Sequence, residues 1–318
     1  MTDPIEINRS FPVSGAARLT LRNVEGAIDI AAGEAGAISV RAVKHPGPGA
    51  NQTEIEITQA ADGSVSVVTH YLEDLVARLF HPRHHGPARV DYTVLLPKDC
   101  QLDVAFVSGQ ARLQGLQGQF ALRSVSGPID LQNLAGRLQI NTVSGPVTAA
   151  HTRLTDGLQL DTVSGDVVFA DSFVPAIAAT SVSGKVQLQT ELGAGPYHFR
   201  SVSGDVWLAV PAMRGCQVDM YALSGRLQTN LPSSRHAASH GWTRVAFGAD
   251  GGGPQVRFNT VSGDLHLVTP GDPHDDGPTP SAGEAASAEP GEPDRLAILE
   301  RIDRGELTVD EAVQHLKT

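Results

Sequence analysis

The feature that most constrains the fold is a four-residue motif, [ST]-V-S-G, which recurs along most of the chain. Its glycines are spaced 18 to 21 residues apart up to residue 225, and one more copy follows 38 residues later. A constant period of this length indicates a chain that stacks one small unit on the next. We interpret the 38-residue step as two periods with one copy eroded. The full and degenerate copies carry Gly109, Gly127, Gly145, Gly165, Gly184, Gly204, Gly225 and Gly263.

Each period contains two strand-like halves. The residues Val125, Gly127, Ile129 and Leu131 alternate with polar neighbours, which is the pattern of a half-buried strand. The next half begins at Leu134, only three residues after Leu131. The apolar residues thus shift from odd-numbered to even-numbered positions, which is a slip in parity. A straight strand would then turn its apolar face outward, so a bend is required at each slip. Two bends per period predict a coil with two short strands.

The predicted fold class is therefore all-β, a β-solenoid of about 18–20-residue repeats. An antiparallel meander of nine-residue strands remains an alternative at this point. In the solenoid, we expect the motif valines to form an interior column. The residue after each motif glycine would lie on an exposed edge, where Asp166, Lys185, Asp205 and Arg226 alternate in charge. The expected interior column consists of Val125, Val143, Val163, Val182 and Val202.

The chain divides into four predicted parts. Residues 1–97 form an N-terminal β portion that is continuous with the solenoid and caps it, since residues 23–30 match the repeat unit. Residues 98–270 form the repeat solenoid. Residues 271–293 are an acidic linker rich in proline, glycine and alanine, which is typical of a flexible tether. Residues 294–318 carry the pattern of a small helical hairpin.

The C-terminal hairpin is the first candidate contact surface. Its second helix begins with a capping box at residues 308–311, and both helices have one apolar face. A hairpin this short buries too little apolar surface to be stable alone, so we expect it to dock, self-associate or hold a partner. The candidate contact residues are Leu299, Ile302, Val313 and Leu316.

A second apolar helical face interrupts the β pattern at residues 70–85. Its simplest interpretation is a helix packed over the β core, and a partner contact is the alternative. His81, His84 and His85 follow, but they lack the carboxylate or cysteine ligands that usually complete a metal site. The candidate contact residues in this segment are Leu72, Leu75, Leu79 and Phe80.

Composition restricts the compartment and the class of partner. The formal net charge is −11, and residues 271–293 hold six acidic residues and no basic ones. No basic stripe supports nucleic-acid binding. The two cysteines are far apart, and the start of the chain lacks a signal-peptide pattern. No run of 18 apolar residues predicts a membrane span. We therefore expect a cytoplasmic protein, with peripheral envelope association as a further option.

The motif serines and acids invite catalytic and metal-binding interpretations. A catalytic serine needs a general base beside it, and eight equivalent serines cannot each have one. The GxSxG pattern is also missing. The residue after the motif glycine varies from Asp to Lys to Pro, which argues against a repeated calcium site. We predict no catalytic residues, no metal site and no cofactor. The scattered candidates for a carbohydrate-active groove are Asp130, Asp161, Asp166, Trp207 and Tyr221.

The repeats and their continuation to residue 267, FNTVSGDLHL, resemble a bacterial "putative adhesin" family of β-solenoid proteins of unknown function, of the LiaX/YvlB type. The match covers roughly residues 15–268. The C-terminal sequence ILERIDRGELTVDEAVQHL is similar to the short SHOCT-like helical modules that accompany such domains. The resemblance implies an envelope-linked or scaffolding role and assigns the repeats no chemistry.

Together these observations predict a non-enzymatic β-solenoid scaffold, linked to cell-envelope stress or assembly. Its C-terminal hairpin would mediate self-association or recruit a protein partner. The alternative is a β-helix protein that binds or cleaves polysaccharide, for which Trp207 would be the first place to look for a ligand if it faces outward.

Overall fold

The computed structural model describes residues 3–47, 49–71, 87–209, 215–231, 233–239, 241–247 and 253–269. The chain divides into two compact units, Met1–Gly277 and Pro278–Thr318, and all the strands that the structure describes lie in the first. All eight predicted contact residues, and the three histidines of the same predictions, lie outside the described part of the chain. These are Leu72, Leu75, Leu79 and Phe80, the three histidines His81, His84 and His85, and Leu299, Ile302, Val313 and Leu316 in the C-terminal segment.

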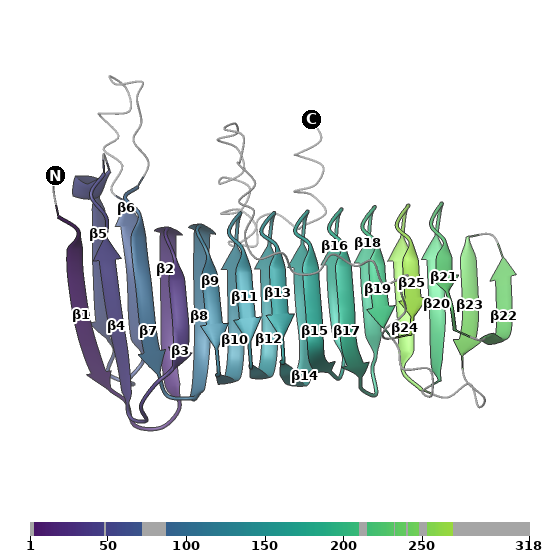
Figure 1. Cartoon of the computed structure of the whole chain (residues 1–318), viewed down its shortest axis with the longest axis horizontal. Helices are drawn as coiled ribbons and strands as arrows, with labels where there is room; N and C mark the ends of the chain where they lie inside the picture. The colour runs from purple at the N-terminus through teal and green to yellow at the C-terminus, as the bar shows by residue number, and fades with distance from the viewer. Residues whose placement is uncertain are drawn as a thin grey trace, which may run out of the picture. The chain divides into compact units, whose positions relative to one another are not determined.

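The strands of the first unit form two columns, and Figure 1 shows the successive strands side by side along the solenoid. The neighbours in the first column, in spatial order, are β5 (Thr53–Gln59), β6 (Val65–Tyr71), β2 (Ala17–Glu25), β8 (Asp99–Ser108), β10 (Gln117–Ser124), β12 (Ala135–Thr142), β14 (Arg153–Thr162), β16 (Ile177–Ser181), β18 (Tyr197–Ser201), β24 (Gln255–Thr260), β20 (Cys216–Ala222), β23 (Trp242–Phe247) and β22 (Ser233–Ser239).

The second column lies across the core from the first. Its neighbours, in spatial order, are β1 (Ile5–Pro12), β4 (Ala37–Lys44), β7 (Val90–Leu96), β3 (Ile28–Ala32), β9 (Ala111–Gln114), β11 (Ile129–Gln132), β13 (Val147–Ala150), β15 (Val167–Val174), β17 (Val186–Leu192), β19 (Val206–Ala209), β25 (Leu265–Val268) and β21 (Leu227–Thr229). A short 3-10 helix, η1 (Ala50–Gln52), precedes β5.

The repeat strands pair in parallel and in register, which confirms the β-solenoid and rules out the meander for this part of the chain. Phe120 pairs with Leu138, and Leu138 with Leu158, so equivalent repeat positions are superposed. Each coil consists of one strand from the first column, a tight turn at the motif, and one strand from the second column. The N-terminal portion is continuous with this stack, because β2 pairs with β8 and β3 with β9.

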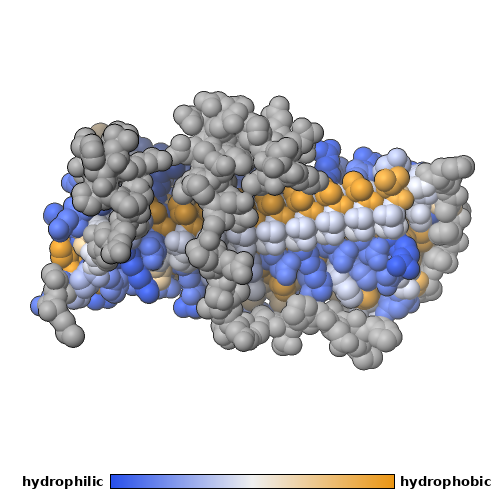
Figure 2. Space-filling view, turned by 90° about the horizontal axis from the view of Figure 1, so that it is seen from above, coloured by the Kyte–Doolittle hydropathy of each residue, from blue (hydrophilic) through white to orange (hydrophobic). Residues whose placement is uncertain are grey.

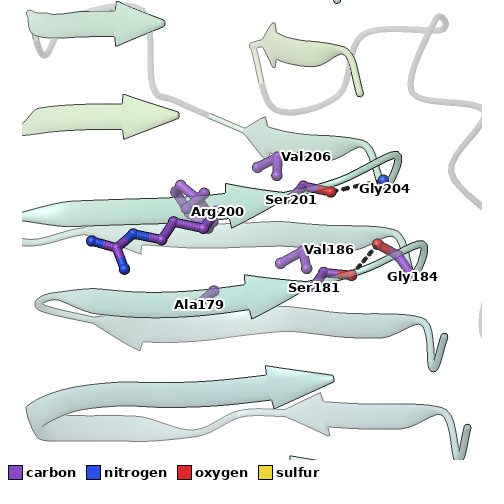
Figure 3. A pocket seen from close by; sticks show the side chains of 9 residues that line it. Ala179, Ser181, Gly184, Val186, Arg200, Ser201, Gly204 and Val206 are labelled. Carbon is purple, nitrogen blue, oxygen red and sulfur yellow. Dashed lines mark hydrogen bonds between the residues drawn. The ribbon is translucent and has the colours of Figure 1, made fainter. Parts of the chain in front are cut away.

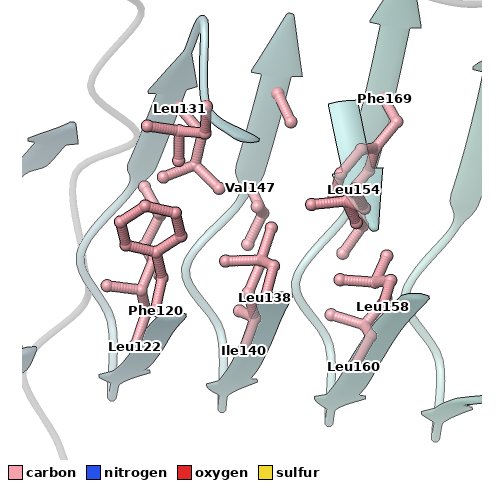
Figure 4. Close-up of a cluster of buried hydrophobic side chains, with 14 of the residues drawn as sticks. Phe120, Leu122, Leu131, Leu138, Ile140, Val147, Leu154, Leu158, Leu160 and Phe169 are labelled. Atoms are coloured by element: carbon pink, nitrogen blue, oxygen red, sulfur yellow. The ribbon is translucent and has the colours of Figure 1, made fainter. Parts of the chain in front are cut away.

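The core lies between the two columns and consists of alternate strand residues, as the period-2 pattern predicts. Phe120, Leu122, Leu138 and Ile140 from the first column face Leu131, Val147 and Phe169 from the second (Figure 4). All of these side chains are at least 98 % buried. At about 1.5–3 kcal/mol for each fully buried aliphatic side chain, these columns are the main source of stability.

The prediction that the motif valines form an interior column is wrong. Val125, Val143, Val163, Val182 and Val202 are only half-buried. The interior positions are the next apolar residues along the chain, such as Ile129 and Leu131. The motif valine lies in the turn, after the chain has left the strand, so the strand alternation does not extend to it.

The order of the last coils is also different from the expectation. The coil of β24 and β25 lies between the coil of β18 and β19 and the coil of β20 and β21. The described residues of the 38-residue step therefore contain no eroded copy. Instead, β22 and β23 form an antiparallel hairpin, in which β23 pairs with β20 and extends the first column. We refer to residues 255–268 as the intercalated coil.

Candidate functional site: the turn edge of the solenoid

The Ser or Thr that begins each full copy of the motif closes the turn. The Ser124 hydroxyl donates to the Gly127 carbonyl at 2.9 Å and accepts from the Gly127 N–H at 3.1 Å. Thr162 makes the same pair of bonds with Gly165, at 3.2 and 3.1 Å. Figure 3 shows the equivalent contacts of Ser181 with Gly184 and of Ser201 with Gly204. The Ser or Thr side chain is buried at these positions, and half-buried at Ser201, because its hydroxyl replaces a backbone partner within the turn.

The motif glycine allows neighbouring coils to approach. A Cβ atom added to Gly145 would lie 2.1 Å from the carbonyl oxygen of Gly127, and one added to Gly165 would lie 2.3 Å from that of Gly145. The contact recurs at the later motif glycines. Only glycine fits at such a column, because the atom in the way belongs to backbone and cannot rotate aside.

The serines at the third position of the motif form a row of hydroxyl groups along the turn edge, which we call the serine ladder. Ser144 donates to the carbonyl of Val125 at 3.2 Å, and Ser164 donates to that of Val143 at 3.3 Å. Each of these eight serines bonds in this way to the turn of a neighbouring coil, so the repeated hydroxyl has a structural role. The serines are Ser108, Ser126, Ser144, Ser164, Ser183, Ser203, Ser224 and Ser262.

The alternating charged edge is not formed as expected. Asp205 is followed in space by Asp264 of the intercalated coil, and Arg226 comes after it. The carboxylates accept backbone N–H groups of the next coil instead of forming ion pairs with the charged side chains there, and Asp264 also accepts from the Gln228 side-chain amide at 3.1 Å. Asp205 accepts from the N–H of Asp264 at 2.8 Å, and Asp264 accepts from that of Arg226 at 2.8 Å. Asp166 does the same for the N–H of Lys185 at 2.9 Å.

Trp207 faces outward, but both faces of its indole ring are occupied. The His266 ring stacks on one face, with centroids 3.8 Å apart and planes 8° from parallel. The Lys185 ammonium lies 4.4 Å from the ring centroid on the side of the preceding coil. Burial lowers the pKa of His266, and the nearby Asp205 and Asp264 oppose that change. The stack joins three adjacent coils and leaves no free aromatic face for a sugar ring.

The remaining candidates for a carbohydrate-active groove are not brought together. Asp130 lies on β11 and Asp166 at the turn before β15, both on the second column, whereas Asp161 and Tyr221 lie on β14 and β20 of the first. Burial raises the pKa of Asp161, but Thr180 and Gln159 hydrogen bond to its carboxylate. Asp161 is therefore a half-buried carboxyl that neutral side chains hold by hydrogen bonds.

No metal site emerges from the described residues. Among them, no three His, Cys, Asp or Glu side chains cluster as metal ligands. One crevice lies between the coils of β16–β17 and β18–β19 (Figure 3). Its lining includes Ala179, Val186, Phe199 and Val206, so it is a gap in the core packing. No helix in the described ranges is long and apolar enough to cross a membrane.

The two thiols are buried in the core. Burial raises the pKa of Cys100 to about 12 and that of Cys216 to about 11. Thiolates are the reactive form of cysteine, so neither group is a nucleophile or metal ligand near neutral pH.

The repeat geometry and the match to known proteins agree. The model of the Toastrack DUF4097 family matches residues 17–268. The chain belongs to the Toastrack family. This bears out the resemblance to a family of adhesin-like proteins of unknown function, and the family match covers the solenoid with its N-terminal portion. Toastrack proteins have a β-solenoid-like fold, as this chain does. No curated protein matches the chain.

Two solved structures are similar to this Toastrack chain. A "putative lipid binding protein" from Parabacteroides distasonis shares 13 % identity with a TM-score of 0.52, and the alignment covers 84 % of this chain and 97 % of that one. A "putative cell adhesion protein" from Clostridium sporogenes shares 10 % identity with a TM-score of 0.29, over 84 % and 100 % of the two chains. The first likeness supports the fold. Together with the geometry, the family match favours a β-fold interaction protein over an enzyme.

Proposed function

We propose that this Toastrack protein is a non-enzymatic scaffold of the bacterial cell envelope or its stress response. In this proposal the solenoid supplies a rigid body, and the C-terminal segment 294–318 recruits a protein partner. The observation that carries the proposal is the use of the repeated hydroxyls. All eight motif serines are engaged in bonds between coils, so the repeat provides a framework and leaves none of these groups for catalysis.

The sequence of the C-terminal segment supports the recruiting role. Leu299, Ile302, Val313 and Leu316 carry the apolar pattern of two amphipathic helices, and an acidic tether of 23 residues precedes them. A flexible chain of that length extends roughly 25–30 Å on average, so a partner held by the segment would stay near the solenoid.

The test is capture of a partner by the full chain. We expect the protein to retain an interacting protein from a bacterial envelope extract, and Leu299→Asp with Leu316→Asp to abolish that retention. Lys317→Ala, a polar change beside the same apolar pattern, is the matched control and should retain the partner. Equal capture by the wild type and the double variant would refute the recruiting role of this segment.

The rival function, binding or cleavage of polysaccharide, is tested separately. Asp166→Asn and Asp205→Asn would abolish binding to a glycan array, or release of reducing sugar, if those carboxylates formed a sugar site. The engagement of both faces of Trp207 and the separation of the acids favour the scaffold.

A further inference from the structure

An apolar ridge runs along the turn edge of the solenoid, next to the serine ladder. The motif valines of successive coils are half-buried, and the exposure increases toward the last coils: Val261 is 48 % exposed and Leu223 is 79 % exposed. Figure 2 shows an apolar row in orange beside a paler row along this edge. We define the valine ridge, in spatial order, as Val24, Val107, Val125, Val143, Val163, Val182, Val202, Val261 and Leu223.

The spacing of the valine ridge is fixed by backbone hydrogen bonds. The N–H of Ser144 donates to the carbonyl of Val125 at 2.8 Å, and the N–H of Ser164 donates to that of Val143 at 2.8 Å. The bonds continue through the intercalated coil, from Ser262 to Val202 and from Ser224 to Val261, each at 2.9 Å. The ridge side chains therefore repeat at the distance between strands, about 4.8 Å. They cannot adjust this spacing to suit a partner.

This fixed repeat restricts what can pack along the full ridge. A helix places apolar side chains on one face about 5–6 Å apart, so it would lose register with the ridge within a few coils. A second solenoid of the same sequence has the same repeat by construction, and its side chains can interdigitate with the ridge along its whole length. We propose that the valine ridge is a homotypic interface, through which two copies of this chain pack edge to edge.

The charges beside the ridge permit this contact. On the side of the second column, Asp166, Lys185, Asp205, Asp264 and Arg226 follow one another, so both signs are present. More than half of the acidic excess of the chain lies in residues 271–293, which are not part of the ridge. The serine ladder adds an uncharged polar border, as the rim of an interface does.

The size of the ridge sets the strength of the contact. Eight steps of about 4.8 Å give a strip about 38 Å long. With a width of about 10 Å, the strip would bury about 400 Å² on each copy, which is below the roughly 800 Å² per partner of a standard stable interface. The interface is therefore a weak one, and the dimer forms and dissociates with protein concentration.

The first experiment is cross-linking of single cysteine variants of the full chain with a short bismaleimide at pH 7. The native thiols, Cys100 and Cys216, are buried and do not compete. We expect Val182→Cys and Val202→Cys to give cross-linked dimers. Thr148→Cys, a half-buried site on the outer face of β13, is the matched control and should give none. Equal cross-linking at Thr148 and at the ridge would overturn the proposal.

The second experiment is sedimentation velocity over a hundredfold range of protein concentration. The wild type should sediment faster as concentration rises, and the double variant Val261→Asp with Leu223→Asp should lose most of that change. Both sites are exposed, so an unchanged circular dichroism spectrum is expected for the folded variant. A wild type that remains monomeric throughout, or a dimer unaffected by the double variant, would refute the interface. Since segment 294–318 is unaltered in these variants, partner capture should persist, and this separates a failure here from a failure of the proposed function.

Discussion

Replacing Gly145 by alanine tests whether the motif glycine is required for close stacking of the coils. The added Cβ would lie 2.1 Å from the carbonyl oxygen of Gly127, so the two coils would have to separate by more than 1 Å. That shift lengthens the bonds Ser144 N–H to Val125 carbonyl and Val143 N–H to Ser124 carbonyl, now 2.8 and 3.1 Å, beyond normal hydrogen-bond range.

The magnitude follows from these contacts. Two weakened backbone bonds cost about 1 kcal/mol each, and overpacking against backbone adds about 1–3 kcal/mol. Alanine restricts the unfolded chain more than glycine does, and this effect stabilises the folded state by about 0.4–1 kcal/mol. The net loss of unfolding free energy is about 2–4.6 kcal/mol. For a domain of this size, that loss lowers the melting temperature by roughly 4–18 °C.

The assay is thermal unfolding followed by far-ultraviolet circular dichroism, with Gly47→Ala as the matched control. Nothing lies within 4 Å of a Cβ atom at Gly47, and its backbone is not in the left-handed region. Gly47→Ala should therefore leave the melting temperature unchanged or slightly raised. If Gly145→Ala melts within 2 °C of the wild type and of this control, the steric account of the motif is wrong.

Three further predictions concern buried groups. Cys100 and Cys216 should resist alkylation by iodoacetamide at pH 8 in the folded protein and react fully in denaturant, as mass spectrometry would show; rapid labelling of the native protein would contradict their burial and raised pKa values. Because the folded-state pKa of His266 lies below its ordinary value, its contribution to stability is present above about pH 6.5 and is lost as the pH falls below that value. Melting curves at pH 7.5 and 5.5 should therefore differ more for the wild type than for His266→Gln, and an equal difference would refute this assignment. Burial raises the pKa of Asp219, but the hydrogen bonds from Arg244 and Gln255 outweigh it, so the net pKa is lowered. Arg244→Met should remove about 1–3 kcal/mol of stability, since it leaves a buried carboxylate without its cation, and a loss below 0.5 kcal/mol in urea unfolding would argue against that pairing.

The fold class could be predicted because the repeat encodes it locally. The parity slip between Leu131 and Leu134 required a bend, and the constant period required stacking, as the parallel pairs show. The apolar alternation alone could not show that Val125 lies in the turn and not in the core. The Ser124 hydroxyl bonds to Gly127 and closes the turn, so the alternation restarts only at Ile129. A Ser or Thr three residues before a glycine was the available signal for such a turn.

The order of the last coils could not be predicted for a different reason. Every coil carries the same motif, so the local pattern is satisfied whichever coil lies next to another. The contacts that fix the intercalated coil join residues about 60 positions apart, such as Trp207 with His266 and Asp205 with the N–H of Asp264. Only the 38-residue step between Gly225 and Gly263 indicated an irregularity, and it was equally consistent with an eroded copy.

The intercalated coil has a consequence for the order in which the protein can be completed. Most of the solenoid can be added coil by coil as the chain is made, since each coil stacks on one already present. The coil of β20 and β21 cannot reach its final place in that way, because its native neighbour is formed by residues 255–268, which are synthesised later. Until those residues are synthesised, β18 and β19 lack their native partner strands β24 and β25. The C-terminal end of the solenoid therefore closes last, when the ribosome has delivered nearly all of the repeat.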